Sequence, residues 1–270
     1  MKILITGGCG QCGSALTALP HQKVFLDREG CVEILGNSEF VQGDLGDITA
    51  LQKAMSGCNA VVHLAAASSP SSPWDEVLRD NIIGTQNVLE AARKAGVERV
   101  VFGSTNHVVG MHEVENAPEI YGLGPKIMLT RSAEPHPDSL YGVSKLYGEH
   151  LGRFYAETGG PKFYALRIGS LVWEDHPFAH AERGVLSGEW KRNSPKYDLM
   201  VQRLKCLWIS KRDFVQIVDL CLSYDALRYD TFYAVSNNPR RWLDIEYARS
   251  ALGYVPQDNA ENWTEPPKAG

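Results

Sequence analysis

Tyr141 and Lys145 stand four residues apart, a spacing that places both side chains on one face of a helix. A lysine ammonium beside a phenol favours the phenolate and lowers the pKa of the tyrosine. Tyr141 would then act as a general base near neutral pH. The same spacing also occurs on ordinary amphipathic helices, so the pair gains weight only together with the signals described next.

Glycines recur at Gly7, Gly8, Gly10 and Gly13, directly after the apolar run Lys2–Thr6 and before a predicted helix. They satisfy both the G-x-G-x-x-G and the G-x-x-G-x-x-G spacing. Glycine at these positions lets the backbone approach a pyrophosphate and direct N–H groups at it. The segment therefore predicts a dinucleotide-binding turn.

Asp27 ends the second predicted strand, twenty residues after Gly7. A carboxylate there accepts hydrogen bonds from the adenosine ribose hydroxyls and repels a 2′-phosphate, which favours NAD over NADP. Arg28, the next residue, could soften that preference or could simply be solvated. Ser104 and Thr105 add two hydroxyls at the carboxyl end of the fifth predicted strand.

Apolar β-branched runs alternate with longer helical patterns, which indicates parallel strands covered by crossover helices. The predicted helices are Asp75–Lys94 and Leu140–Glu157. The predicted strands are Lys2–Thr6, Lys23–Asp27, Phe40–Gln42, Ala60–Leu64, Arg99–Ser104 and Lys162–Arg167. The expected fold is α/β, a Rossmann-type doubly wound parallel sheet with a small C-terminal substrate lobe.

Regularity is lost after Arg167, and residues 171 to 202 show little periodicity. Beyond them we expect a helix near Asp213–Tyr224, a strand near Phe232–Val235 and a helix near Leu243–Leu252. The expected division is a nucleotide-binding domain over residues 1–167 and a small lobe over 168–270, packed on the same fold. A crevice between them would hold the substrate.

The chain has 270 residues and a formal charge of -5. Mild acidity without a Lys/Arg run argues against a nucleic-acid partner. The apolar runs are too short for a membrane span or a signal peptide. His176 and His180 could suggest a metal site, but Pro177 disrupts the helix that would align them, so no metal is expected.

Six cysteines are scattered without the spacing of a disulfide framework, namely Cys9, Cys12, Cys31, Cys58, Cys206 and Cys221. We expect them to be reduced and the protein to be cytoplasmic. Cys9 and Cys12 form a C-x-x-C motif at a helix N-terminus. A redox role is one reading of it, and two small residues filling a nucleotide loop is the favoured one.

The combination of glycine turn, Asp27, Thr105 and the Tyr141–Lys145 pair resembles the extended short-chain dehydrogenase/reductase family, also called the NAD-dependent epimerase/dehydratase family. The resemblance implies that Thr105 holds the reacting oxygen, Tyr141 is the acid/base and Lys145 binds the nicotinamide ribose. It also implies Asp44 and Leu45 near the adenine. The full implied NAD-binding set is Gly7, Gly10, Gln11, Cys12, Gly13, Asp27, Arg28, Asp44, Leu45, Leu64, Ala65, Ala66, Asn81, Ser104, Tyr141, Lys145 and Ile168.

Within that family the chain is most similar to the uronate dehydrogenases, which oxidise C1 of free aldohexuronates to lactones. Asn106-His107, directly after Thr105, carries this likeness most distinctively. It implies a small acidic monosaccharide as substrate, bound by Gln11, Ser68, Thr105, Asn106, His107, Tyr141, Ser170 and Arg203. Arg203 stands five residues before Trp208 and would grip the carboxylate, and Arg183 competes for that role.

Other readings stay open. A dehydrogenase of another sugar, such as glucose 6-phosphate, would share most of these residues, and a nucleotide-sugar epimerase or dehydratase would use the same catalytic trio. A non-catalytic NAD-binding regulator is the alternative of a different class. The sequence also leaves open a homo-oligomer paired, as is typical of the family, through the helix of Tyr141.

Overall fold

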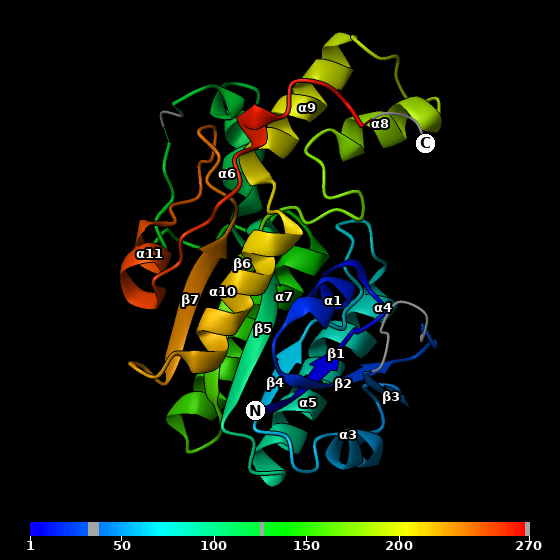
Figure 1. The fold of residues 1–270 in the computed structure, drawn as a ribbon, viewed down its shortest axis with the longest axis vertical. Coiled ribbons are helices and arrows are strands. Elements are labelled where there is room, and N and C mark those ends of the chain that lie inside the picture. Colours follow the sequence, from blue (N-terminus) through cyan, green and yellow to red (C-terminus); the bar gives the residue numbers. More distant parts are fainter. Residues whose placement is uncertain (32–37, 125–126, 268–270) are drawn as a thin grey trace.

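The computed structural model describes residues 1–31, 38–124 and 127–267, which form a seven-stranded sheet with helices on both faces (Figure 1). All neighbouring strands are parallel, and their order is β3-β2-β1-β4-β5-β6-β7. The strands are β1 (Lys2–Thr6), β2 (Gln22–Asp27), β3 (Glu39–Gln42), β4 (Ala60–His63), β5 (Arg99–Thr105), β6 (Lys162–Ile168) and β7 (Tyr229–Ala234). The predicted doubly wound α/β fold is confirmed, and the first six strands match their predicted bounds to within one residue.

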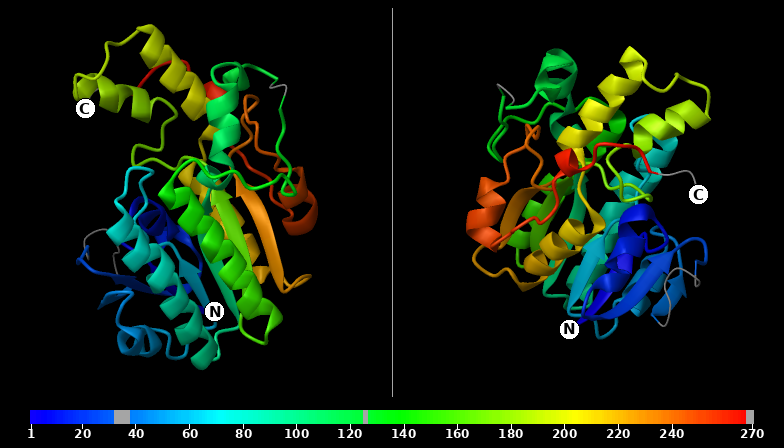
Figure 2. Two further views of the ribbon diagram at one scale, coloured as in Figure 1. Left: turned by 180° about the vertical axis from the view of Figure 1, so that it is seen from behind. Right: turned by 45° about the horizontal axis from the view of Figure 1, so that its top comes forward.

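The sheet has two cores because successive side chains of a strand point to opposite faces. Ile3 and Ile5 pack in the core that holds Phe214 of α10, whereas Leu4 packs with Leu89 of α5 in the other. One face is covered by α3 (Ile48–Ala54), α5 (Gly84–Lys94) and α7 (Leu140–Glu157), and the other by α1 (Gln11–Ala15), α10 (Lys211–Ser223) and α11 (Glu246–Leu252) (Figure 2).

Residues after Arg167 contribute both to the sheet and to a cap above it. The strand near Phe232, expected in the second lobe, is β7 and pairs with β6 in the main sheet. The region 171–202, expected to be irregular, contains α8 (Ala179–Leu186) and most of α9 (Pro195–Leu207). Ser194 caps α9 and Pro195 occupies its first turn, a start signal that weak apolar periodicity obscured. With α6 (Gly110–Asn116), these helices lie above the carboxyl ends of the strands (Figure 1).

The predicted helix Asp75–Lys94 is present but not uniform. It consists of α4 (Trp74–Glu76), a π-helical segment Val77–Ile83, and α5. π-helical turns widen the helix locally and occur often at functional sites. Here the segment carries Asp80 and Asn81, both buried.

The expectation that all six cysteines are reduced is wrong for two of them, because Cys9 and Cys31 form a disulfide. The chain brings the loop after β2 against the glycine turn, with the two Cα atoms 5.6 Å apart. The spacing of 22 residues in the sequence carries no sign of this proximity. Cys12 is a free thiol, and burial raises its pKa to about 11, which argues against a Cys9–Cys12 redox pair.

Candidate active site

A pocket of about 720 Å³ opens at the carboxyl ends of β1 and β4, where the order of the sheet reverses. Ligands of doubly wound sheets bind at this switch point. The predicted site residues that line it are Gly7, Gly10, Gln11, Cys12, Gly13, Asp27, Arg28, Asp44, Leu45, Leu64, Ala65, Ala66, Ser68, Ser104, Thr105, Tyr141, Lys145, Ile168 and Ser170. Asn81, Asn106, His107 and Arg203 do not line it.

The glycine turn leaves no room for side chains where it contacts its own backbone. Gly7 has a φ of +72°, and a Cβ on it would lie 2.6 Å from the Ala65 nitrogen. A Cβ on Gly13 would lie 2.2 Å from the Gly7 oxygen. The turn is therefore a tight backbone cradle at the start of α1, which fits a dinucleotide pyrophosphate.

Gly13→Ala is expected to weaken NADH binding at least tenfold and to lower Tm. The new Cβ would clash with the backbone oxygen of Gly7, which cannot shift without distorting the turn. Gly10→Ala is the matched control for stability, since its Cβ would meet only the Gly7 oxygen, at 3.3 Å. Fluorescence titration and thermal unfolding measure both variants. Equal Tm values for Gly13→Ala and the unmodified protein would contradict the cradle.

Asp27 is held at the end of β2 by two backbone N–H groups. Its Oδ2 accepts from Cys9 at 2.9 Å, and its Oδ1 accepts from Arg28 at 2.8 Å. These bonds lock the carboxylate between the glycine turn and the pocket. Asp44 and Leu45 line the pocket as well, and the Asp44 carboxylate lies 3.8 Å from Arg28. Their contact with an adenine stays a prediction.

Tyr141 and Lys145 lie on the first turns of α7, which Ser139 caps through the Gly142 N–H. Both are buried, and the Lys145 Nζ is 5.9 Å from the centroid of the Tyr141 ring. The expected lowering of the tyrosine pKa is not found in the cofactor-free protein. Burial dominates and raises the pKa of Tyr141, with the Thr105 hydroxyl acting in the opposite direction.

Burial lowers the pKa of Lys145 to about 8. Above that pH the free protein holds a neutral lysine, and binding an anionic dinucleotide must then take up a proton. We expect the affinity for NADH to be constant below about pH 7.5 and to fall above pH 8, approaching tenfold per pH unit. Titrations from pH 7 to 9.5 test this, with Lys145→Met as the variant in which the dependence disappears.

Two of the predicted cofactor-binding residues make hydrogen bonds within the protein. Ser104 donates to the Glu149 carboxylate at 2.5 Å, so its hydroxyl is already engaged. Asn81 bonds both backbone groups of Ala67 and donates to Ser144 on α7 at 2.8 Å, so it ties the loop after β4 to the catalytic helix. This contact could not be inferred from a sequence separation of 63 residues.

His107 of the Asn106-His107 pair lies beside Tyr141. His107 contacts Asp138 through Nδ1 at 2.7 Å, and its ring packs edge-on against Tyr141 with centroids 5.9 Å apart. The Asn106 Nδ2 is buried and has no hydrogen-bond partner among the described residues. Gln11 lines the pocket and donates to the Leu171 oxygen at 2.8 Å.

Neither candidate arginine is unpaired in this structure. Arg203 donates to Glu113 on α6 at 2.6 Å, and the buried Tyr121 hydroxyl bonds the same carboxylate. Arg183 pairs with Glu174, and both of these side chains are about 40% exposed. The expectation that Arg203 faces the pocket is not met, because α6 supplies a buried acid that the sequence did not connect to it.

His180 lines the pocket and was not among the predicted site residues. Burial, with smaller contributions from Arg183 and Arg203, lowers its pKa to about 4. His180 therefore presents a neutral imidazole to the pocket near neutral pH. The signal for it lay in the His176–His180 segment, which the sequence suggested only as a metal site and which Pro177 argued against.

No group of three or more His, Cys, Asp or Glu side chains within 1–31, 38–124 and 127–267 is arranged to hold a metal ion. In the same part of the chain no helix is long and apolar enough to span a membrane.

Taken with the parallel sheet, this pocket defines a dinucleotide-dependent enzyme of the doubly wound α/β class. A model of the NAD dependent epimerase/dehydratase family matches residues 3–227, and the chain belongs to that family. The predictions of family, enzymatic class and NAD as cofactor are thereby confirmed.

Two relatives and one solved structure show which enzymes this chain is similar to. The NAD-dependent glucose-6-phosphate dehydrogenase of Haloferax volcanii is 35% identical over 97% of this chain and 95% of its own. The uronate dehydrogenase of Agrobacterium fabrum is 31% identical over 96% and 86%. A crystal structure of Agrobacterium tumefaciens uronate dehydrogenase, a tyrosine-to-alanine mutant complexed with NAD, has a TM-score of 0.76 and 29% identity, over 99% of this chain and 91% of that one. The chain is thus similar to NAD-dependent dehydrogenases named for different sugars.

Proposed function

We propose that this protein oxidises C1 of a free aldohexuronate, of the glucuronate or galacturonate type, to the aldarolactone. The observation that carries the acidic substrate is the partly exposed Arg183, which lies about one helical turn from the pocket-lining His180 on α8. An anionic substituent on the sugar is stabilised there. The likeness to uronate dehydrogenases over nearly the whole chain supports the same reading.

The chemistry at C1 needs a proton acceptor and a donor to the same oxygen. Tyr141 removes the proton of the O1 hydroxyl, and Thr105 hydrogen-bonds that oxygen as its C–O bond order rises. A bound NAD would supply the hydride acceptor for C1. Below its pKa of about 8, Lys145 is protonated, and its charge opposes the burial that raises the pKa of Tyr141, while burial of both residues excludes water from the reacting atoms.

The two arginines differ in how freely they can turn towards a substrate. The Arg203–Glu113 pair is largely buried, and removing Arg203 from it would leave an uncompensated carboxylate. The Arg183–Glu174 pair is exposed, and such pairs contribute about 0–1 kcal/mol. We therefore assign the direct carboxylate contact to Arg183 and a through-space contribution to Arg203.

Glucose 6-phosphate is the second candidate substrate, because the Arg183 guanidinium can also bind a phosphate and a relative named for that sugar is 35% identical. NADH formation with glucuronate, galacturonate, glucose 6-phosphate, glucose and L-arabinose separates the two. We expect turnover of the uronates. Turnover of glucose 6-phosphate alone would overturn the uronate assignment and keep the C1 chemistry.

The same panel, extended by UDP-glucose and UDP-glucuronate, tests the remaining readings. An epimerase or dehydratase would convert a nucleotide sugar without releasing NADH, and a non-catalytic regulator would bind NADH but turn over none of the sugars.

Arg183→Gln should raise KM for the acidic substrate about tenfold or more with a smaller change in kcat. An unchanged KM would remove Arg183 from the carboxylate site.

A further inference from the structure

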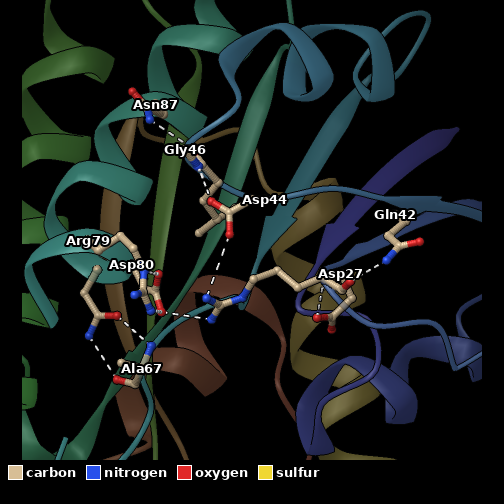
Figure 3. A network of polar contacts seen from close by, with 11 residues as sticks. Asp27, Gln42, Asp44, Gly46, Ala67, Arg79, Asp80 and Asn87 are labelled. Atoms are coloured by element: carbon tan, nitrogen blue, oxygen red, sulfur yellow. Dashed lines mark hydrogen bonds and ion pairs between the residues drawn. The ribbon is translucent and has the colours of Figure 1, made fainter. Parts of the chain in front are cut away.

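The adenosine end of the pocket contains a network of carboxylates and guanidinium groups (Figure 3). At its centre is Asp80, which is 5% exposed. Its Oδ2 accepts from Arg28 at 2.9 Å, and Arg79 donates to both of its oxygens at 2.8 and 3.0 Å. The Asp44 carboxylate lies 3.8 Å from the other terminal nitrogen of Arg28.

Arg28 stands where a 2′-phosphate would have to be recognised. It directly follows Asp27, the acid placed to bind the adenosine ribose, and it lines the pocket. A guanidinium at this position can grip a phosphate bidentately. Here it reaches across to Asp80, and the two sides of the pocket are joined by this ion pair (Figure 3).

Asp80 is built to stay charged. The guanidinium groups of Arg79 and Arg28 outweigh its burial and lower its pKa. Its backbone is positioned by the π-helical segment Val77–Ile83, and the adjacent Asn81 anchors that segment to the loop after β4 and to α7. The acid that holds Arg28 therefore belongs to a rigid part of the structure.

The charges around the ribose sum to a net negative value. Asp27, Asp44 and Asp80 contribute three negative charges, and Arg28 and Arg79 contribute two positive ones. A 2′-phosphate would add further negative charge next to Asp27 and Asp44. Charges of like sign at such short distances repel, so these carboxylates disfavour a 2′-phosphate.

We propose that Asp80 determines cofactor specificity: it sequesters Arg28 and thereby keeps the pocket selective for NAD over NADP. The inference rests on the cofactor site and not on the sugar that the enzyme oxidises. In the absence of the Asp80 charge, Arg28 turns towards the adenosine ribose that Asp27 is placed to bind, and it becomes a ligand for the 2′-phosphate. Asp27 alone would disfavour NADP, and Asp80 holds the guanidinium of the next residue, which could otherwise compensate for it.

The test measures binding without any sugar, by titrating NADH and NADPH against protein fluorescence. Asp80→Asn is expected to tighten NADPH binding about tenfold or more and to change NADH binding much less. The double variant Asp80→Asn with Arg28→Gln should lose that gain. Asp75→Asn, an exposed acid on the same helical stretch, is the control for net charge and should leave both affinities unchanged.

Thermal unfolding is recorded first, and Asp80→Ser is the second variant if Asp80→Asn does not fold, since a serine hydroxyl can still accept a bond from Arg79. Equal affinity of the unmodified protein for NADH and NADPH would overturn the proposal. So would a gain in NADPH affinity that survives Arg28→Gln, or no gain in a folded Asp80 variant. Failure of the uronate assignment would leave each of these affinities as expected.

Discussion

Tyr141→Phe is expected to lower kcat about 1000-fold while NADH still binds. Acid/base groups contribute about 10²- to 10⁴-fold to the rate of a proton transfer. Phenylalanine keeps the ring that packs edge-on against His107 and removes only the hydroxyl. NADH formation with the preferred sugar and NADH titration measure the two quantities separately.

Tyr147→Phe on the same helix is the matched control, because Tyr147 does not line the pocket and should keep nearly full activity. The kcat of the unmodified enzyme should also increase as pH rises. The pKa of Tyr141 is raised by burial, so the fraction of phenolate grows with pH through the alkaline range. Retention of more than a tenth of the activity in Tyr141→Phe would contradict the assigned role.

Glu149→Ala is expected to destabilise the protein by about 3–5 kcal/mol. Glu149 of α7 and Arg167 of β6 form a buried bidentate pair with distances of 3.0 and 2.8 Å, and Ser104 of β5 donates to the same carboxylate. Loss of the acid leaves a buried guanidinium without a partner. The pair also holds α7, and hence Tyr141, against the sheet, so kcat should fall with Tm.

Two comparisons distinguish this effect from a general loss of charge. Glu149→Leu combined with Arg167→Met removes both charges and should recover most of the stability, as replacement of a buried pair by apolar residues often does. Arg153→Ala breaks the exposed pair with Glu157 on the same helix and should leave the free energy of unfolding nearly unchanged. A similar loss in Arg153→Ala and Glu149→Ala would show that burial is not the cause. Chemical denaturation measures each free energy of unfolding.

Much of the fold follows from residues close together in the chain. The apolar runs predicted six strands to within one residue, and the four-residue spacing placed Tyr141 and Lys145 on one face of α7. The glycine turn and Asp27 predicted a dinucleotide pocket, and both line the pocket of the structure. These features are local, because strand and helix periodicities depend on nearest neighbours along the sequence.

Local pattern failed where an element had weak periodicity. α9 carries a serine cap and a proline in its first turn, whereas α8 has no side-chain cap, and both have mixed side chains. The sequence therefore predicted no helix there and did not place His180 at the pocket. β7 was recognised as a strand, but its place beside β6 depends on the completed sheet. Tertiary packing stabilises such segments more than their own propensity does.

The sequence by itself determined the dinucleotide turn, the catalytic residue types and the family that they resemble. Only the tertiary structure decided which charges meet: Arg28 with Asp80, Arg203 with Glu113, and Cys9 with Cys31. It also decided the pKa values, because burial raises that of Tyr141 and lowers that of Lys145. Ion pairing and desolvation depend on distances through space, and partners far apart in the chain leave no spacing by which a sequence could reveal them.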